Sequence, residues 1–450
     1  MRNLASNYER RVQTLLILMF LAVLTVSLLM TRLALNDALI PLGLVYAVLY
    51  LALAWRSRTA AMTMVYIAAL FPWDIGGEGV ALGIGELHLT LLTLLVVVDF
   101  VTKRWPLPRN PLYVPVAIYL MICTISSVQN FRGKYATVSL LQMVLYFLIT
   151  TAVFSCFLTE ARQYRRVLYG IVFGGMFLAV SAVVSAVLTG SNYFLGMHKN
   201  AIGGALSYAV IICAELWFAA RGSHARARLS IALSIICVGL LLSLSRGGWL
   251  CAIMGLMVIL LLRGDLKLFF KVFGVLTPVV IVCWILLPDD SKIYAFNTDI
   301  KAANYQARLD SIEYARAQFE AAPWLGQGVG LRKTYDATNV VWLTLAETGL
   351  LGLAGFTFIH VSFFVMAIKA RLRIHASDPR FSMLAVGMGL LCGKFIHGCV
   401  DHYWSRGSLL VVWGGVGMAI AAYYSIMRDP QPDNLPTTAL VHSAVGEANI

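Results

Sequence analysis

The chain has 450 residues, of which 60% are hydrophobic and 13% are charged, and its mean hydropathy is +0.79. A soluble protein of this length could not keep so much apolar surface from water, so the composition excludes a soluble globular fold. The net charge of +13 would suit a nucleic-acid-binding protein. In a membrane protein, however, the positions of the basic residues say more than their sum.

Continuous apolar stretches recur along the chain, and each is long enough to cross a bilayer as a helix. They are continuous rather than alternating, which favours helices over the strands of a barrel. The predicted fold class is therefore an all-α integral membrane protein with about fourteen transmembrane helices and one long loop between the eleventh and twelfth. In chain order we predict spans at about 14–31, 35–54, 59–71, 86–101, 111–127, 138–157, 167–188, 201–219, 229–244, 248–262, 268–287, 341–368, 381–399 and 408–426.

The basic residues give an orientation. The segment "MRNLASNYERR" shows no cleavage site before the first apolar run, so we expect it to be a retained cytosolic start. The segments then on the cytosolic side hold 22 of the 35 Lys and Arg residues, whereas the short loops of the opposite side hold 7. This bias predicts that both termini are cytoplasmic. We expect a membrane domain at 1–426, with the long outer loop at about 288–340, and a disordered cytoplasmic tail at 427–450.

Two short outer segments carry polar residues. "MHKN" at 197–200 presents His198 and Lys199 to the outer side, with helix capping as the alternative role. "LLSLSRGGWLC" interrupts two apolar runs, and we interpret Ser245–Gly248 as a tight turn whose glycines allow the reversal. Arg246 would then bind a phosphate through two parallel hydrogen bonds. The alternative is that its side chain extends to the lipid headgroups beside an interfacial tryptophan.

The long loop begins with a helical pattern in which Leu309, Ile312, Ala315 and Phe319 share a face. "APWLGQGVG" then ends that helix with proline and glycine. Asp336, Thr338 and Asn339 follow at the start of the next helix, where Thr338 is a plausible N-cap. Glu347 lies about two turns further inward, and a buried acid needs a partner or a purpose.

"HGCVDHYWSRG" at 397–407 collects His397, Asp401, His402 and Arg406 in one outer loop. Tyr403 and Trp404 beside them are candidates for stacking on a sugar. The alternative is a loop of interfacial aromatics with solvated charges.

The "LSRGG" turn, the loop arginine before "PWLGQGVG" and "TNVVWLTLAETGLLGL" resemble the O-antigen ligase/O-antigen polymerase superfamily over about residues 195–365. The resemblance implies a GT-C type glycosyltransferase of the bacterial inner membrane. Such an enzyme works on the periplasmic face without a metal or other cofactor and takes a polyprenyl-diphosphate-linked glycan as donor. It implies that Arg246 and Arg308 bind the diphosphate, with Arg406 and Lys199 as further candidates, and that Asn339 matches the asparagine of a His-Asn pair.

The sequence departs from this family at Thr338, where ligases commonly have a histidine that acts as base towards the acceptor hydroxyl. Threonine cannot accept a proton near neutral pH, so the catalytic candidates are His198, Asp336, Asp401 and His402. Thr338, Asn339, Tyr403 and Trp404 are the substrate-binding candidates.

The lost histidine favours a polymerase of polysaccharide repeat units over a ligase that transfers the glycan to lipid A–core or another acceptor. A secondary transporter is the rival from another class, but we find neither repeated halves nor matching broken helices. A purely structural envelope protein is a further alternative. The expected partners are the lipid-linked glycan, a glycan or lipid acceptor and membrane lipid, with a chain-length regulator as a further candidate.

Overall fold

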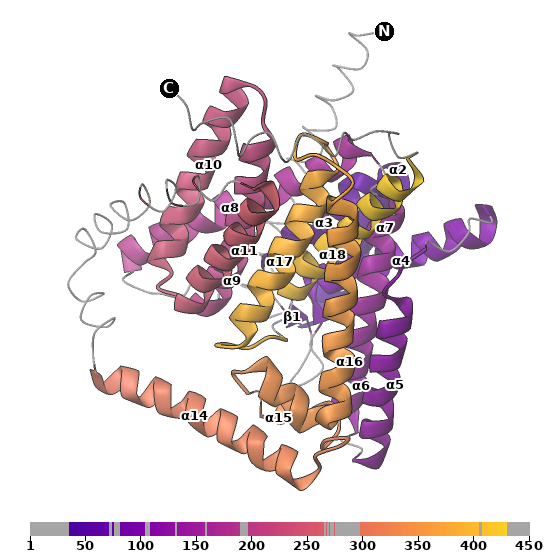
Figure 1. The fold of residues 1–450 in the computed structure, drawn as a ribbon, viewed down its shortest axis with the longest axis vertical. Helices are drawn as coiled ribbons and strands as arrows, with labels where there is room; N and C mark the ends of the chain where they lie inside the picture. Colours follow the sequence, from indigo (N-terminus) through magenta and orange to yellow (C-terminus); the bar gives the residue numbers. More distant parts are fainter. Residues whose placement is uncertain are drawn as a thin grey trace, which may run out of the picture.

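The protein is an all-α membrane protein, seen in a computed structural model (Figure 1). The structure describes residues 36–71, 74–75, 82–103, 109–130, 133–157, 160–189, 197–264, 298–335, 337–404 and 407–429, and the single positions 267, 270 and 274. The helices are α2 (Asn36–Arg56), α3 (Arg58–Ala69), α4 (Ile84–Lys103), α5 (Tyr113–Gln129), α6 (Lys134–Met143), the π-helix η1 (Val144–Thr150), α7 (Thr151–Phe157), α8 (Ala161–Thr189), α9 (Lys199–Ala219), α10 (Ser223–Leu242), α11 (Arg246–Arg263), α14 (Thr298–Ala321), α15 (Leu331–Thr334), α16 (Val340–Arg371), α17 (Phe381–Gly398) and α18 (Ser408–Arg428). The strands β1 (Asp74–Ile75) and β2 (Leu82–Gly83) form one short antiparallel pair.

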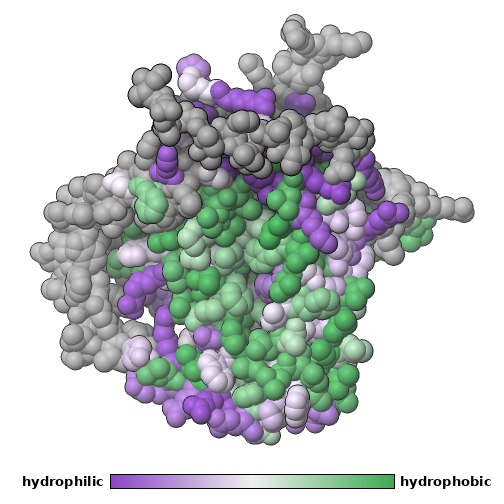
Figure 2. Space-filling view, in the orientation of Figure 1, coloured by the Kyte–Doolittle hydropathy of each residue, from purple (hydrophilic) through white to green (hydrophobic). Residues whose placement is uncertain are grey.

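The helices follow the predicted spans closely. Twelve of the predicted spans overlap helices of the structure. The span at 14–31 lies outside the described residues, and so does that at 268–287 apart from positions 270 and 274. Within the described part, nine helices are long and apolar enough to cross a membrane, with α6, η1 and α7 running as one span. In Figure 2, hydrophobic side chains cover the middle of the visible face, and hydrophilic ones gather along its lower rim. The chain is thus a multi-pass membrane protein.

Three helices form the centre of the bundle. Buried residues make up 83% of an apolar 18-residue stretch of α9 and of α17, and 78% of that of α18. The corresponding share in α10 is only 28%. Glycines let these helices approach closely, because a Cβ at Gly255 of α11 would lie 3.0 Å from the Gly389 oxygen of α17. A Cβ at Gly387 would likewise lie 2.7 Å from the oxygen of Gly415 in α18.

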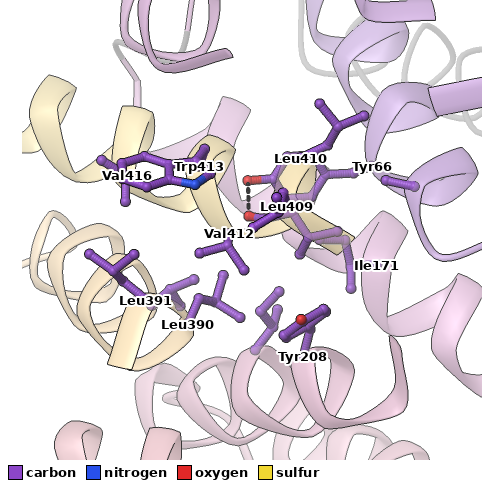
Figure 3. Packing of buried hydrophobic residues seen from close by; sticks show 14 of the residues in the cluster. Tyr66, Ile171, Tyr208, Leu390, Leu391, Leu409, Leu410, Val412, Trp413 and Val416 are labelled. Carbon is purple, nitrogen blue, oxygen red and sulfur yellow. Dashed lines mark hydrogen bonds between the residues drawn. The ribbon is translucent and has the colours of Figure 1, made fainter. Parts of the chain in front are cut away.

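Figure 3 shows α18 in the interior of the protein, where its side chains point in several directions into the core. Leu409, Leu410, Val412, Trp413 and Val416 are all buried there. The Tyr66 hydroxyl of α3 donates to the Val411 carbonyl of α18 at 3.1 Å, so a polar group is satisfied inside the apolar core. The first turn of α18 is therefore held firmly.

The predicted cytosolic ends of several helices meet at a buried ion pair. Glu215 near the end of α9 accepts from Arg263 at the end of α11, at 3.0 Å and 2.5 Å. The Ser382 hydroxyl at the start of α17 donates to the same carboxylate at 2.7 Å. The opposite ends of α9, α11 and α17 consequently meet at the other end of the bundle.

α14 crosses that other end and leads into a broken helix (Figure 1). The predicted helix in the long loop is confirmed, but the predicted stripe is wrong at Leu309, which is 40% exposed. Ala315 of the predicted stripe is buried, and Ser311 is buried in place of Leu309, because the face that meets α16 is rotated from the predicted one.

α16 is interrupted at Gly349, whose φ of 64° and ψ of −164° suit only glycine. The segment "PWLGQGVG" fills the interruption. Gln327 and Gly328 donate to the carbonyls of Ala346 and Glu347 at 2.8 Å and 2.9 Å, and Leu350 donates to Pro323 at 2.8 Å. The interrupted backbone is thereby satisfied within the protein, as a bilayer requires.

Candidate active site

A cavity of about 280 Å³ lies where α9 begins, α17 ends and α18 begins. It brings together three of the predicted catalytic candidates, His198, Asp401 and His402, with His397 as a fourth polar residue. The other lining residues are Ala69, Leu70, Asn200, Ala201, Gly204, Ala205, Tyr208 and Ser408. The predicted outer segments "MHKN" and "HGCVDHYWSRG", about two hundred residues apart, thus face one another across one cavity.

His198 caps α9, as the alternative interpretation of "MHKN" expected. Its Nδ1 accepts from the backbone N–H of Asn200 at 3.3 Å. Burial lowers the pKa of His198, and the neighbouring Lys199 lowers this pKa further, so the ring is neutral at pH 7. With Nδ1 accepting, the proton of the neutral ring resides on Nε2, which makes His198 a hydrogen-bond donor towards a ligand. Lys199 occupies the first position of α9 and is half-buried.

The "SRGG" segment is not the turn that the sequence predicts. α10 ends at Leu242, and the chain reverses through Leu244, whose φ is +52°, so the reversal does not use the glycines. Ser245 caps α11 by accepting from Gly248 N–H at 3.3 Å, and Arg246 is the first residue of the helix. The Arg246 side chain is exposed, and no partner for it is found among the described residues.

The two glycines after Arg246 allow close packing. A Cβ at Gly248 would lie 2.7 Å from the carbonyl carbon of Gly203 in α9. A Cβ at Gly247 would lie 2.7 Å from Cδ2 of His397. Arg246 is therefore one residue from a direct contact with the ring of a cavity histidine.

Three elements hold the loop that follows α17. Arg308 of α14 donates from Nη1 to the Val400 carbonyl at 2.6 Å, and its Nη2 lies 3.9 Å from Asp401 Oδ2. Asn339 donates to the Cys399 carbonyl at 3.0 Å, and buried Lys394 donates to the His402 carbonyl at 3.2 Å. The Arg308 side chain remains 40% exposed, so part of its guanidinium is open to a ligand.

Asn339, and not Thr338, is the N-cap of α16. Its Oδ1 accepts from the N–H groups of Val341 and Trp342 at 3.0 Å and 3.2 Å. The Thr338 hydroxyl lies 3.0 Å from the hydroxyl of Ser311 in α14. The prediction of Thr338 as cap was wrong because the helix begins one residue later, and the Thr338 hydroxyl links two elements instead.

Asn339→Ala should destabilise the protein by about 1–2 kcal/mol, because it removes both the cap and the link to Cys399. Asn339→Asp keeps the capping oxygen but loses the N–H donor, so it should cost less than alanine. Thermal unfolding of the purified variants in detergent measures both. Equal shifts for the two variants would mean that only the link to the Cys399 carbonyl matters.

Tyr403 and Trp404 turn away from the loop surface. Tyr403 is fully buried against Phe356 at a ring separation of 5.6 Å, and burial raises its pKa well above the ordinary range. Trp404 is 9% exposed, with the Arg332 guanidinium carbon 3.8 Å from its ring centroid. In this arrangement both aromatics anchor the loop. Asp336 and Arg406 lie outside the described residues.

The partner of Glu347 is Arg332, which the sequence did not single out. The guanidinium Nε donates to Glu347 Oε1 at 3.0 Å, and Nη2 donates to Oε2. Oε1 also accepts the backbone N–H groups of Gly330 and Arg332, at 3.1 Å and 3.0 Å. No local pattern predicts this pair, because Arg332 and Glu347 lie 15 residues apart on two different helices. His397 was noticed in the sequence only as a member of its loop.

Residues 229–357 match the family model described as O-antigen ligase. The comparison with curated proteins gives no match. The matched segment contains Arg246, Arg308, Thr338, Asn339 and Glu347, and it ends before the loop that supplies Asp401 and His402. The resemblance inferred from the sequence is confirmed by this match, which shows that residues 229–357 are similar to the O-antigen ligase family.

Proposed function

We propose that this protein is a glycosyltransferase of the bacterial inner membrane that acts at the periplasmic face on a polyprenyl-diphosphate-linked glycan. Its most favoured reaction is the polymerisation of repeat units into an O-antigen or exopolysaccharide chain. The observation that carries the proposal is the cavity at one end of the bundle, where His198, Asp401 and His402 meet beside Arg308 and the start of α11.

The charge distribution supports the orientation. The short loops at the end opposite the cavity belong to the cytosolic set that is rich in Lys and Arg, and the Glu215–Arg263 pair lies at that end. By the positive-inside rule, the cavity then opens towards the periplasm, where a lipid-linked donor presents its glycan. The diphosphate of such a donor would sit at headgroup depth, within reach of arginines at helix ends.

The proposed reaction is a single displacement. An acceptor hydroxyl oxygen attacks the anomeric carbon, the bond from that carbon to the diphosphate oxygen breaks, and the electron pair leaves with the diphosphate. Arg246 and Arg308 stabilise the charge that develops on the leaving group through charge-assisted hydrogen bonds. Direct attack inverts the anomeric centre, and the arginines supply the positive charge that a metal ion would otherwise provide.

The O-antigen ligase description of the matched family favours a second candidate, transfer of the glycan to lipid A–core. The absence of a histidine at position 338 is the observation that favours polymerisation. The match to a glycan-transferring family favours either enzyme over a transporter.

Purified full-length protein supplied only with lipid-diphosphate-linked repeat units tests the proposal. A ladder of longer products, unchanged by a chelator, is the expected result for a metal-independent polymerase. Product that forms only after lipid A–core is added would make the protein a ligase. No transfer to either acceptor, with donor and protein intact, would overturn the proposed function.

A further inference from the structure

His397 is a buried histidine whose hydrogen bonds are incomplete. It is 4% exposed, lines the cavity, and neither ring nitrogen has a hydrogen-bond partner among the described residues. A buried imidazole without partners costs free energy, so the arrangement calls for a ligand or a function. The proposed function as stated above does not use this residue.

We propose that His397 is the base that accepts the proton of the acceptor hydroxyl, and that Asp401 positions its ring. This inference rests on the proposed glycosyl transfer and names the proton acceptor of the same site. It goes beyond the family resemblance, which places the base at position 338 and ends near residue 365.

Asp401 is placed to orient the ring. Its Oδ2 lies 4.0 Å from His397 Nε2, one helical turn away along the chain, and Oδ1 is fixed by the N–H of His402 at 2.8 Å. Contacts between a base and its orienting carboxylate are often long without substrate and shorten when it binds. With the Nε2 proton directed to Asp401, the lone pair resides on Nδ1.

The other candidates are less suited to accept a proton. The Nδ1 lone pair of His198 already accepts from Asn200, which leaves its Nε2–H as a donor. The Asp401 carboxylate already faces protein groups, because Oδ1 accepts from the His402 N–H at 2.8 Å and Oδ2 lies 3.9 Å from the Arg308 guanidinium. His402 is exposed, so water competes for its ring.

The end of the helix that carries His397 meets the start of α16, where the family histidine is missing. Asn339, the neighbour of Thr338, donates to the carbonyl of Cys399, two residues beyond His397. The start of α16 and the end of α17 thus meet, and a histidine on α17 can serve an acceptor bound near position 338. Gly247 leaves the space for the ring, since a Cβ there would lie 3.0 Å from Nε2.

In the proposed step, the acceptor O–H bond breaks and its proton passes to Nδ1 of His397. The oxygen forms the new glycosidic bond, and the former bonding pair leaves on the diphosphate. The resulting imidazolium is stabilised by Asp401, and it returns its proton to water or to the released diphosphate.

The test measures transfer by full-length His397→Gln, with His360→Gln as a matched control. His360 is also a buried histidine, at 8% exposure, but its Nδ1 is paired with the Phe356 carbonyl of its own helix. His397→Gln should lower kcat by about 100-fold or more with the KM for the donor little changed. His360→Gln should transfer at the wild-type rate.

If His397→Gln disturbs folding, His397→Ala and Gly247→Ala test the same inference independently. External imidazole should partly restore transfer by His397→Ala and should do nothing for Arg246→Ala. Gly247→Ala, which pushes the ring aside, should lower kcat, whereas Gly222→Ala meets no atom within 4 Å and should not.

A folded His397→Gln variant that keeps more than half of the wild-type kcat would overturn the inference while leaving the proposed function intact. Failure of the wild-type protein to transfer to any acceptor would instead overturn the proposed function, and the inference with it.

Discussion

Replacement of Arg246 by alanine is expected to reduce glycan transfer by about 100- to 1,000-fold while leaving the protein folded. Arg246 is exposed at the first position of α11, and no partner for its side chain is found in the described part of the chain. The cap of α11 is made by Ser245, so the helix does not need the arginine. The substitution should therefore weaken the interaction with the donor diphosphate and leave the stability of α11 unchanged.

Arg246→Lys separates geometry from charge. Lysine keeps the positive charge but cannot form the paired hydrogen bonds of a planar guanidinium, so it should recover only part of the activity. Arg316→Ala is the matched control, because Arg316 is 64% exposed and pairs with Glu320 on its own helix. Transfer rates and donor KM values of the three variants give the comparison. Wild-type transfer rates for Arg246→Ala would show that Arg246 does not bind the donor and only lies at the membrane interface.

The two predicted diphosphate arginines differ in how they are held. Arg308 donates one hydrogen bond to the Val400 carbonyl and thereby helps to position the loop that contains Asp401. Its remaining N–H donors are open to a ligand. Arg246 makes no such contact with any residue that the structure describes. An Arg308 variant would therefore combine effects on loop position and on binding, and Arg246 gives the cleaner test of phosphate recognition.

The membrane helices could be predicted because a segment that crosses lipid must be apolar throughout its length. This property is local, which is why the predicted span at 341–368 agrees with α16 despite the break at Gly349. The break itself could not be predicted. It depends on "PWLGQGVG" supplying hydrogen bonds from another part of the chain.

Several residues that line the cavity could be singled out from the sequence, but their arrangement in space could not. Outer polar residues at 198, 401 and 402 stood out because charges and imidazoles are rare in such a chain. The role of His397 could not be seen, because it depends on the turn of α17 that faces Gly247 and Asp401. Tyr403 and Trp404 looked like surface aromatics, since no local pattern records that Phe356 and Arg332 cover them.

Glu347→Gln is expected to destabilise the protein by about 3–5 kcal/mol, the largest stability effect that we predict. The glutamine leaves the Arg332 guanidinium buried, with 4% of its side chain exposed and no carboxylate to balance it. The same carboxylate accepts two backbone N–H groups, from Gly330 and Arg332, so the loop over the broken helix also loosens. Thermal unfolding in detergent measures the loss.

Two further variants separate the charge from the loop contacts. Glu320→Gln removes one partner of the exposed Arg316–Glu320 pair and should cost at most about 1 kcal/mol. Combining Arg332→Met with Glu347→Leu removes both buried charges and should recover part of the stability lost in Glu347→Gln, since no unpaired ion remains. It should not recover transfer, because Arg332 also covers Trp404, three residues from Asp401. If Glu347→Gln unfolds no earlier than Glu320→Gln, the buried pair does not hold the loop, and the position of Asp401 depends on Arg308, Asn339 and Lys394 instead.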